Sequence, residues 1–215
     1  MKKAVIFDLD GTLLNTVESI AYFANKTLEK YGYGTIETEK YKKLTGNGAR
    51  VLMERMLKEV HAEGYDFEKM LRDYNKSYDD DFMYLTRPYD GILDMLGELR
   101  KKGIKTAVIS NKPDSTTVQV VREMMGELTP DIVRGGREGV PLKPDPTAVL
   151  EIIEQLGVEK ADCLYVGDTA TDMETGKNAG LFTVGVLWGF RDREEIEKAG
   201  AKAIVSKPAE ILKLI

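Results

Sequence analysis

The sequence predicts an α/β protein in which a doubly wound, Rossmann-like parallel sheet carries an inserted helical domain. Short apolar runs that end in Asp, Ser or Gly recur along the chain, as expected for strands buried on both faces. These runs are residues 4–7, 106–109, 163–166 and 183–187. Helical patterns separate most of them, and this alternation is typical of parallel strands joined by crossover helices.

Two of the intervening segments carry clear helix signals. Apolar residues recur at helical spacing over 92–99, and the segment ends in Lys101, Lys102 and Gly103, with positive charge in the last turn and Gly at the exit. The segment 149–156 ends in the same way at Gly157. We therefore expect each of these helices to cross back over the sheet.

Residues 15–86 interrupt this alternation because they contain consecutive helical patterns and no convincing strand. A turn at Gly46-Asn47-Gly48 separates two of the apolar helix faces. Pro88 then ends the helical stretch, because proline disfavours α geometry in the residue before it. We predict an α/β core formed by 1–14 and 87–215, with 15–86 inserted as a helical cap.

Composition excludes several classes of protein. The 215 residues are 42% hydrophobic and 31% charged, which indicates a globular protein. The net charge is −5 and the two signs are interspersed, so nucleic acid is not an expected partner. The apolar run 4–7 is too short for a signal peptide or a membrane span, and the single Cys163 cannot form an internal disulfide. We expect a cytoplasmic protein with no membrane partner.

The first cluster of reactive residues, Asp8-Leu9-Asp10-Gly11-Thr12, follows the first apolar run. Side chains two residues apart in extended chain project to the same side, so Asp8 and Asp10 can converge. One carboxylate could attack an electrophile while the other transfers a proton, provided that a cation offsets their repulsion. The alternative is an Asp-rich turn with solvated side chains.

Two further clusters suit a phosphate group. Ser110 and Asn111 follow the run 106–109, where a hydroxyl and backbone N–H groups can bind phosphate oxygens. Lys143 precedes Asp145-Pro146, a predicted helix start. Alternatively, Ser110 and Asn111 belong to an ordinary turn and Lys143 is a solvated lysine in a proline-rich loop.

The fourth cluster contains Asp168 and Asp172, which follow the run 163–166. Two acids separated by small residues suit a hard cation such as Mg²⁺, although Asp172 could instead cap a helix. All four clusters follow predicted strands or lie at their carboxyl edge, where open α/β sheets bind ligands. We therefore predict one site built from all of them.

These motifs resemble, in order, the four motifs of the haloacid dehalogenase superfamily of phosphohydrolases. The insert resembles the helical cap of that superfamily, and its segment 46–55 is similar to the cap of bacterial phosphoglycolate phosphatases. One departure is Asn15-Thr16, where relatives usually have Asp-Ser or Asp-Thr. It keeps a helix-capping side chain and loses a charge.

The resemblance implies a phosphatase that acts through an aspartyl phosphate. Asp8 is then the nucleophile, Asp10 the general acid and base, and Lys143 a catalytic cation. The implied phosphate ligands are Gly11, Thr12, Ser110 and Asn111. The implied Mg²⁺ site consists of Asp8, Asp10 through its backbone carbonyl, Asp168 and Asp172.

The resemblance also implies a small phosphorylated metabolite as substrate, with 2-phosphoglycolate favoured. We expect Gly46, Asn47 and Arg50 of the cap to contact it, although Arg50 could equally be a solvated helix residue. Alternatives of the same family are a pyrophosphatase, a sugar-phosphate phosphatase and a phosphomutase similar to β-phosphoglucomutase. A non-catalytic phosphate-binding regulator is disfavoured because both Asp8 and Asp10 are present. Monomer and homodimer both remain open.

Overall fold

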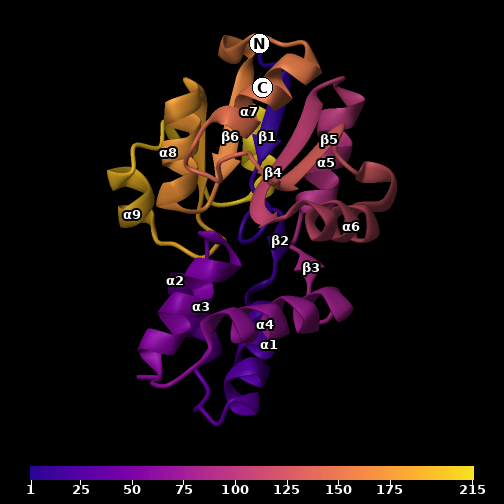
Figure 1. The fold of residues 1–215 in the computed structure, drawn as a ribbon. Coiled ribbons are helices and arrows are strands. Elements are labelled where there is room, and N and C mark those ends of the chain that lie inside the picture. Colours follow the sequence, from indigo (N-terminus) through magenta and orange to yellow (C-terminus); the bar gives the residue numbers. More distant parts are fainter. The chain divides into compact units, whose positions relative to one another are not determined.

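The computed structural model describes residues 1–215, and its central feature is a six-stranded parallel sheet (Figure 1). The strand order is β5-β4-β1-β6-β7-β8, so the first strand of the chain lies in the middle. The strands are β1 (Ala4–Phe7), β4 (Lys105–Pro113), β5 (Ile132–Gly136), β6 (Cys163–Gly167), β7 (Phe182–Val186) and β8 (Ala203–Val205). The predicted α/β class with a parallel sheet is confirmed.

Strand β1 is buried on both faces, as its unbroken apolar sequence predicts. It pairs in parallel with β4 on one side and with β6 on the other. Ala4 and Ile6 pack in a core cluster that includes residues of α7 (Thr147–Leu156). Val5 and Phe7, which alternate with them, are equally inaccessible to solvent. The polar residues that follow β1 are therefore held at the end of the most buried strand.

Helices connect the strands of this unit. They are α5 (Ile92–Lys101), α6 (Asp114–Met125), α7, α8 (Ala170–Ala179) and α9 (Arg193–Lys198), with short 3₁₀ helices at Gly126–Leu128, Lys160–Asp162 and Pro208–Leu214. Helix α7 ends at Gly157 in the left-handed conformation, as its sequence predicts. Helix α7 begins at Thr147, one residue later than expected, and the carboxylate of Asp145 accepts from the N–H of Thr147.

A second compact unit comprises residues 16–87, and the first comprises 1–15 with 88–215. The second unit contains the helices α1 (Val17–Lys30), α2 (Thr38–Leu44), α3 (Gly48–Glu59) and α4 (Phe67–Asp80). Helix α1 packs on both α2 and α4. Tyr41, Met53, Met56 and Met70 are fully buried within the unit and form much of its core.

Several short strands were not predicted from the sequence. Strand β5 contains Arg134 and a Gly pair, and β8 has only three residues, so neither gives the apolar run that marks the central strands. The two-residue strands β2 (Leu14–Asn15) and β3 (Arg87–Pro88) lie where the chain leaves and re-enters the first unit. Two residues are too few to show a periodic pattern.

None of the helices combines the length and the apolar character that a membrane crossing requires.

Replacing Ile152 tests the packing of α7 on the sheet. Ile152 is fully buried in the cluster that contains Ala4 and Ile6, so Ile152→Ala should lower the free energy of unfolding by about 2–5 kcal/mol. Leu93 on α5 is 39% exposed, and Leu93→Ala is the matched control, with an expected change below about 1 kcal/mol. Urea denaturation measures both, and equal losses would contradict the assigned core.

Candidate active site

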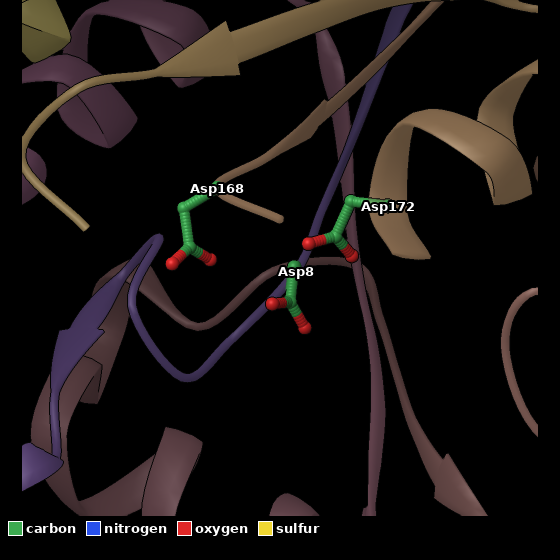
Figure 2. A group of neighbouring side chains, drawn as sticks. All are labelled: Asp8, Asp168 and Asp172. Atoms are coloured by element: carbon green, nitrogen blue, oxygen red, sulfur yellow. The ribbon is translucent and has the colours of Figure 1, made fainter. Parts of the chain in front are cut away.

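Three carboxylates converge at the carboxyl end of the sheet. Asp8 follows β1 and Asp168 follows β6, while Asp172 lies in the first turn of α8. Figure 2 shows the three side chains grouped together, and each has a carboxylate oxygen within 4.8 Å of those of the other two. All three residues are buried. The sequence therefore brings three negative charges into a space with little solvent.

Lys143 supplies the opposite charge. Its Nζ donates to Asp8 Oδ1 at 2.6 Å and to Asp172 Oδ1 at 2.7 Å. The side chain of Lys143 is only 5% exposed. A lysine is seldom buried to this extent unless it is paired, so the interpretation of Lys143 as a solvated loop residue is wrong.

The side chain of Asn111 fixes the backbone of Lys143. Asn111 Oδ1 accepts from the Lys143 N–H at 2.8 Å, and Asn111 Nδ2 donates to the Lys143 carbonyl at 3.2 Å. These reciprocal bonds tie the end of β4 to the loop before α7. Asn111 therefore positions Lys143, a function that we did not predict from its place in a strand-end turn.

Asp172 has two structural functions. Its Oδ2 accepts from the N–H and the hydroxyl of Thr169, and the Thr169 hydroxyl in turn caps the start of α8. This reciprocal arrangement is a capping box. Its Oδ1 accepts from Lys143. The helix-cap interpretation and the active-site interpretation of Asp172 are therefore compatible.

Both oxygens of Asp168 are also held. Thr12 Oγ1 donates to Oδ1 at 3.0 Å, and the N–H of Phe190 donates to Oδ2 at 2.7 Å. Gly11 and Gly189 approach this side chain so closely that a Cβ on either would lie 2.3 Å from an atom of Asp168. Gly11 also has a φ of +88°, a conformation that other residues rarely adopt.

Asp10 retains more contact with solvent than the other acids. Its side chain is 20% exposed, whereas that of Asp8 is 8% exposed. Lys112 Nζ lies 3.3 Å from Asp10 Oδ1, but this contact lacks hydrogen-bond geometry, and Oδ1 is buried without a hydrogen-bond partner. Ser110, which is also buried, accepts from the Lys112 N–H.

The buried charges shift several pKa values. Burial, and next the charge of Asp172, raise the pKa of Asp8 well above its usual value. The same two causes raise the pKa of Asp168 to about 7. Burial alone would lower the pKa of Lys143, but Asp172 and Asp8 outweigh burial and raise it. The amino acids present thus leave excess negative charge around Asp8 and Asp168.

This donor set fits a hard divalent cation. Carboxylate oxygens are the ligands that such cations prefer, and the raised pKa values of Asp8 and Asp168 mean that burial and the charge of Asp172 disfavour their ionised forms when no cation is bound. Asp8 and Asp168 are the better candidates for direct ligands. Lys143 holds only one oxygen of Asp8, and Asp168 accepts only from the neutral donors Thr12 and Phe190. Asp172, in contrast, accepts from the ammonium of Lys143 at one oxygen and from Thr169 at the other.

The predicted cap residues lie in the second unit, at the start of α3. Gly46 and Gly48 have φ values of +110° and +85°, and Asn47 Oδ1 accepts from Arg55 at 2.8 Å. Arg50 donates to both oxygens of Glu68, and both side chains are more than half exposed. In this structure Arg50 is thus part of an exposed ion pair. Its predicted contact with substrate stays a prediction.

Several residues of the site were given no function in it from the sequence. Lys112 lies beside Asp10, Phe190 holds Asp168, and the indole of Trp188 donates to the carbonyl of Thr12. Trp188 and Phe190 both lie in the segment that follows β7 (Phe182–Val186). The available signal was their position directly after β7, at the same edge of the sheet.

Metal binding should depend on pH. A carboxyl whose pKa is raised by folding contributes most to stability below its unfolded pKa, and this contribution is lost as pH rises through the folded pKa. For Asp168 that loss extends to about pH 7. The melting temperature of the metal-free protein should therefore fall between about pH 5 and about pH 8, and excess MgCl₂ should raise it more at the higher pH.

Differential scanning fluorimetry with EDTA-treated protein measures this effect. Asp168→Asn is the control, and it should reduce both the pH dependence and the gain from MgCl₂. A gain that is the same at both pH values would contradict a cation site at these carboxylates.

Comparison with known proteins gives consistent matches. The profile of the haloacid dehalogenase-like hydrolase family matches residues 5–186. A phosphoglycolate phosphatase of Aquifex aeolicus is 33% identical over 213 residues, which cover 99% of this chain and 96% of the relative. An N-acetylmuramic acid 6-phosphate phosphatase of Pseudomonas aeruginosa is 27% identical, with coverage of 99% and 94%.

Solved structures agree. A crystal structure from Lactobacillus delbrueckii subsp. bulgaricus, described provisionally as a phosphoglycolate phosphatase, superposes with a TM-score of 0.93. It is 31% identical and covers 100% of this chain and 99% of its own.

Proposed function

The chain belongs to the haloacid dehalogenase-like hydrolase family and is a phosphatase, and from this premise we propose that it hydrolyses 2-phosphoglycolate with Mg²⁺. One observation carries the proposed mechanism: Lys143 joins Asp8 to Asp172 in a buried cluster that also contains Asp168. A phosphoryl group at this place would meet a nucleophile and a cation together.

Asp8 is the proposed nucleophile. Lys143 holds Oδ1, so Oδ2 is available to attack phosphorus. Attack forms an aspartyl phosphate and breaks the bond to the ester oxygen of the substrate. Lys143 fixes the orientation of the attacking carboxylate and offsets part of the charge of the arriving phosphate.

Asp10 is the proposed general acid and base. Its greater exposure suits a group that must exchange protons with the leaving oxygen and then with water. It gives its proton to the departing alkoxide and later accepts one from the water that hydrolyses the aspartyl phosphate. Two carboxylates thus take different functions because their surroundings differ.

The proposed phosphate ligands surround Asp8. Ser110 is buried at the end of β4, and Lys143 is held there by Asn111. We assign the hydroxyl of Ser110 and the backbone N–H of Asn111 to the phosphate oxygens. The N–H groups of Gly11 and Thr12 already donate to the carbonyls of Leu14 and Leu9, so we keep Gly11 and Thr12 as residues of the phosphate loop and not as N–H donors. Thr12 also holds Asp168, so the same loop would serve the phosphate and the cation site.

Mg²⁺ would be held by Asp8, the backbone carbonyl of Asp10 and Asp168. Asp172 would contribute to the same site without being a preferred direct ligand. When bound, the cation offsets the repulsion between anionic nucleophile and anionic substrate. Hydrogen bonds from Thr12 and Phe190 keep the carboxylate of Asp168 oriented toward Asp8. Hydrogen bonds from neighbouring groups that fix a carboxylate in this way are typical of carboxylates that bind metal.

The substrate assignment rests on the relatives, several of which are phosphoglycolate phosphatases. We assign catalysis to residues 1–14 with 87–215, and substrate selection to the helical cap 15–86 with Gly46, Asn47 and Arg50. A sugar-acid phosphate is the second candidate, because an N-acetylmuramic acid 6-phosphate phosphatase also matches nearly the whole chain. We place the enzyme in the cytoplasm, as a monomer or homodimer.

A phosphate-release assay tests this proposal. Metal-stripped protein is assayed with and without MgCl₂ on 2-phosphoglycolate, N-acetylmuramic acid 6-phosphate, pyrophosphate and hexose phosphates. We expect the highest kcat/KM with 2-phosphoglycolate and activity only with added cation. A clear preference for another member of the panel would overturn the substrate, and full activity in metal-stripped protein would overturn the cation.

Asp8→Asn should reduce kcat by at least about a thousandfold, because an amide keeps the shape of the side chain but is a far weaker nucleophile. Steady-state release from 2-phosphoglycolate measures the loss, and an unchanged circular dichroism spectrum shows that the fold persists. A variant that retains a tenth of the wild-type kcat would contradict covalent catalysis by Asp8.

Asp10→Asn should affect poor leaving groups most. General acid catalysis contributes about 10²–10⁴-fold, and its contribution shrinks when the leaving oxygen needs no proton. Single-turnover phosphorylation should therefore fall more with an alkyl phosphate than with a nitrophenyl phosphate. Equal losses with both substrates would argue against Asp10 as the acid.

A further inference from the structure

We propose that Lys112 recognises the carboxylate of the substrate, an inference that rests on the proposed function. Lys112 lies in the first compact unit with Asp8, Asp10 and Lys143, and no step described above uses its side chain. The carboxylate of 2-phosphoglycolate carries a charge that the phosphate-binding residues do not address. Its recognition needs a cation close to the leaving oxygen.

The side chain of Lys112 carries the second ammonium group of the site and is half-buried. It is 10% exposed, and its Nζ lies 3.3 Å from Asp10 Oδ1. Arg50, the cationic cap residue that is expected to contact the substrate, is 54% exposed and bound to Glu68. Truncating a desolvated charge pair costs far more binding than truncating an exposed one. Burial therefore favours Lys112 over Arg50 as the residue that selects a carboxylate.

The backbone of Lys112 is fixed on three sides. Its N–H donates to Ser110 Oγ at 3.1 Å, and its carbonyl accepts from Thr117 Oγ1 at 3.2 Å. A Cβ on Gly135 would lie 2.5 Å from the same carbonyl, so β5 passes close beside it. Because the backbone of Lys112 is fixed, its side chain starts from a defined position and is suited to select a ligand group at a defined distance.

The distances suit 2-phosphoglycolate. If Asp10 protonates the ester oxygen from Oδ2, the oxygen that does not face Lys112, the ester oxygen lies within about 8 Å of Lys112 Nζ, because each contact spans about 3 Å and the two carboxylate oxygens are about 2 Å apart. In 2-phosphoglycolate the carboxylate oxygens lie about 3–4 Å from the ester oxygen, since only two carbon atoms intervene. The carboxylate can therefore approach Nζ to hydrogen-bond distance while Asp10 contacts the ester oxygen.

The charge of the site agrees with this assignment. Lys143 and the proposed cation would offset the charges of Asp8, Asp168 and Asp172. Asp10 is then the acid that remains beside Lys112. An ammonium group carries three N–H donors, so contact with Asp10 is compatible with a second anionic partner. Lys112 would then link the proton donor to the group that identifies the substrate.

The test compares 2-phosphoglycolate with its neutral amide, 2-phosphooxyacetamide, in the wild type, Lys112→Met, Lys112→Arg and Arg50→Ala. Lys112→Met should lower kcat/KM for the acid about thirtyfold more than for the amide, mainly through KM. Lys112→Arg should restore part of this difference because it restores the charge. Arg50→Ala tests the cationic residue of the cap, and its selective loss for the acid should be smaller than that of Lys112→Met.

Each result distinguishes the possibilities. Equal losses of Lys112→Met on both substrates would show that Lys112 serves only Asp10, and would overturn the inference. A selective loss in Arg50→Ala without one in Lys112→Met would also overturn it. A wild type that shows no preference for the acid would overturn the proposed substrate itself, before any variant is measured. Melting temperatures confirm that each variant is folded, and Lys112→Gln replaces Lys112→Met if that variant unfolds.

Discussion

The ion pairs of Lys143 with Asp8 and Asp172 are the interaction on which the site depends. Burying one ammonium and several carboxylates is costly unless their charges are paired, and removal of one partner typically costs 3–5 kcal/mol. Neighbouring contacts keep these partners in place. Asn111 ties the backbone of Lys143 to the end of β4, and Thr169 orients Asp172 at the start of α8. The charges lie at the same edge of the sheet because β1, β4 and β6 are parallel neighbours.

The excess of negative charge explains why one lysine is insufficient. Burial and mutual repulsion raise the pKa values of Asp8 and Asp168, so the protein alone does not stabilise their ionised forms. A nucleophile must nevertheless be ionised near neutral pH. A divalent cation bound beside these carboxylates would stabilise their ionised forms. The same carboxylates would then serve both catalysis and cation binding.

The sequence was sufficient to predict the central strands and the motifs that follow them. Residues 4–7 form β1 as predicted, because an apolar run closed by Asp8 has a clear beginning and end. The edge strands β5 and β8 lack such runs, so they were missed. Burial of Lys143, the contact of Lys112 with Asp10 and the bond from Phe190 to Asp168 join residues far apart in the chain. Local patterns cannot show which distant partners meet, so these details required the structure.

The capping box of Asp172 has a consequence for how substitutions at this position are interpreted. The carboxylate of Asp172 caps the start of α8 through Thr169 and also accepts a hydrogen bond from the ammonium of Lys143. A substitution at Asp172 therefore affects both the stability of the fold and catalysis. In a library of variants, changes at Asp172 would disappear from a selection for soluble expression and from a selection for activity alike. Asp10 does not cap a helix, so its variants should pass the selection for soluble expression and fail the selection for activity. Loss of function at Asp172 therefore carries little information about the chemical step, whereas loss at Asp10 reports on it directly.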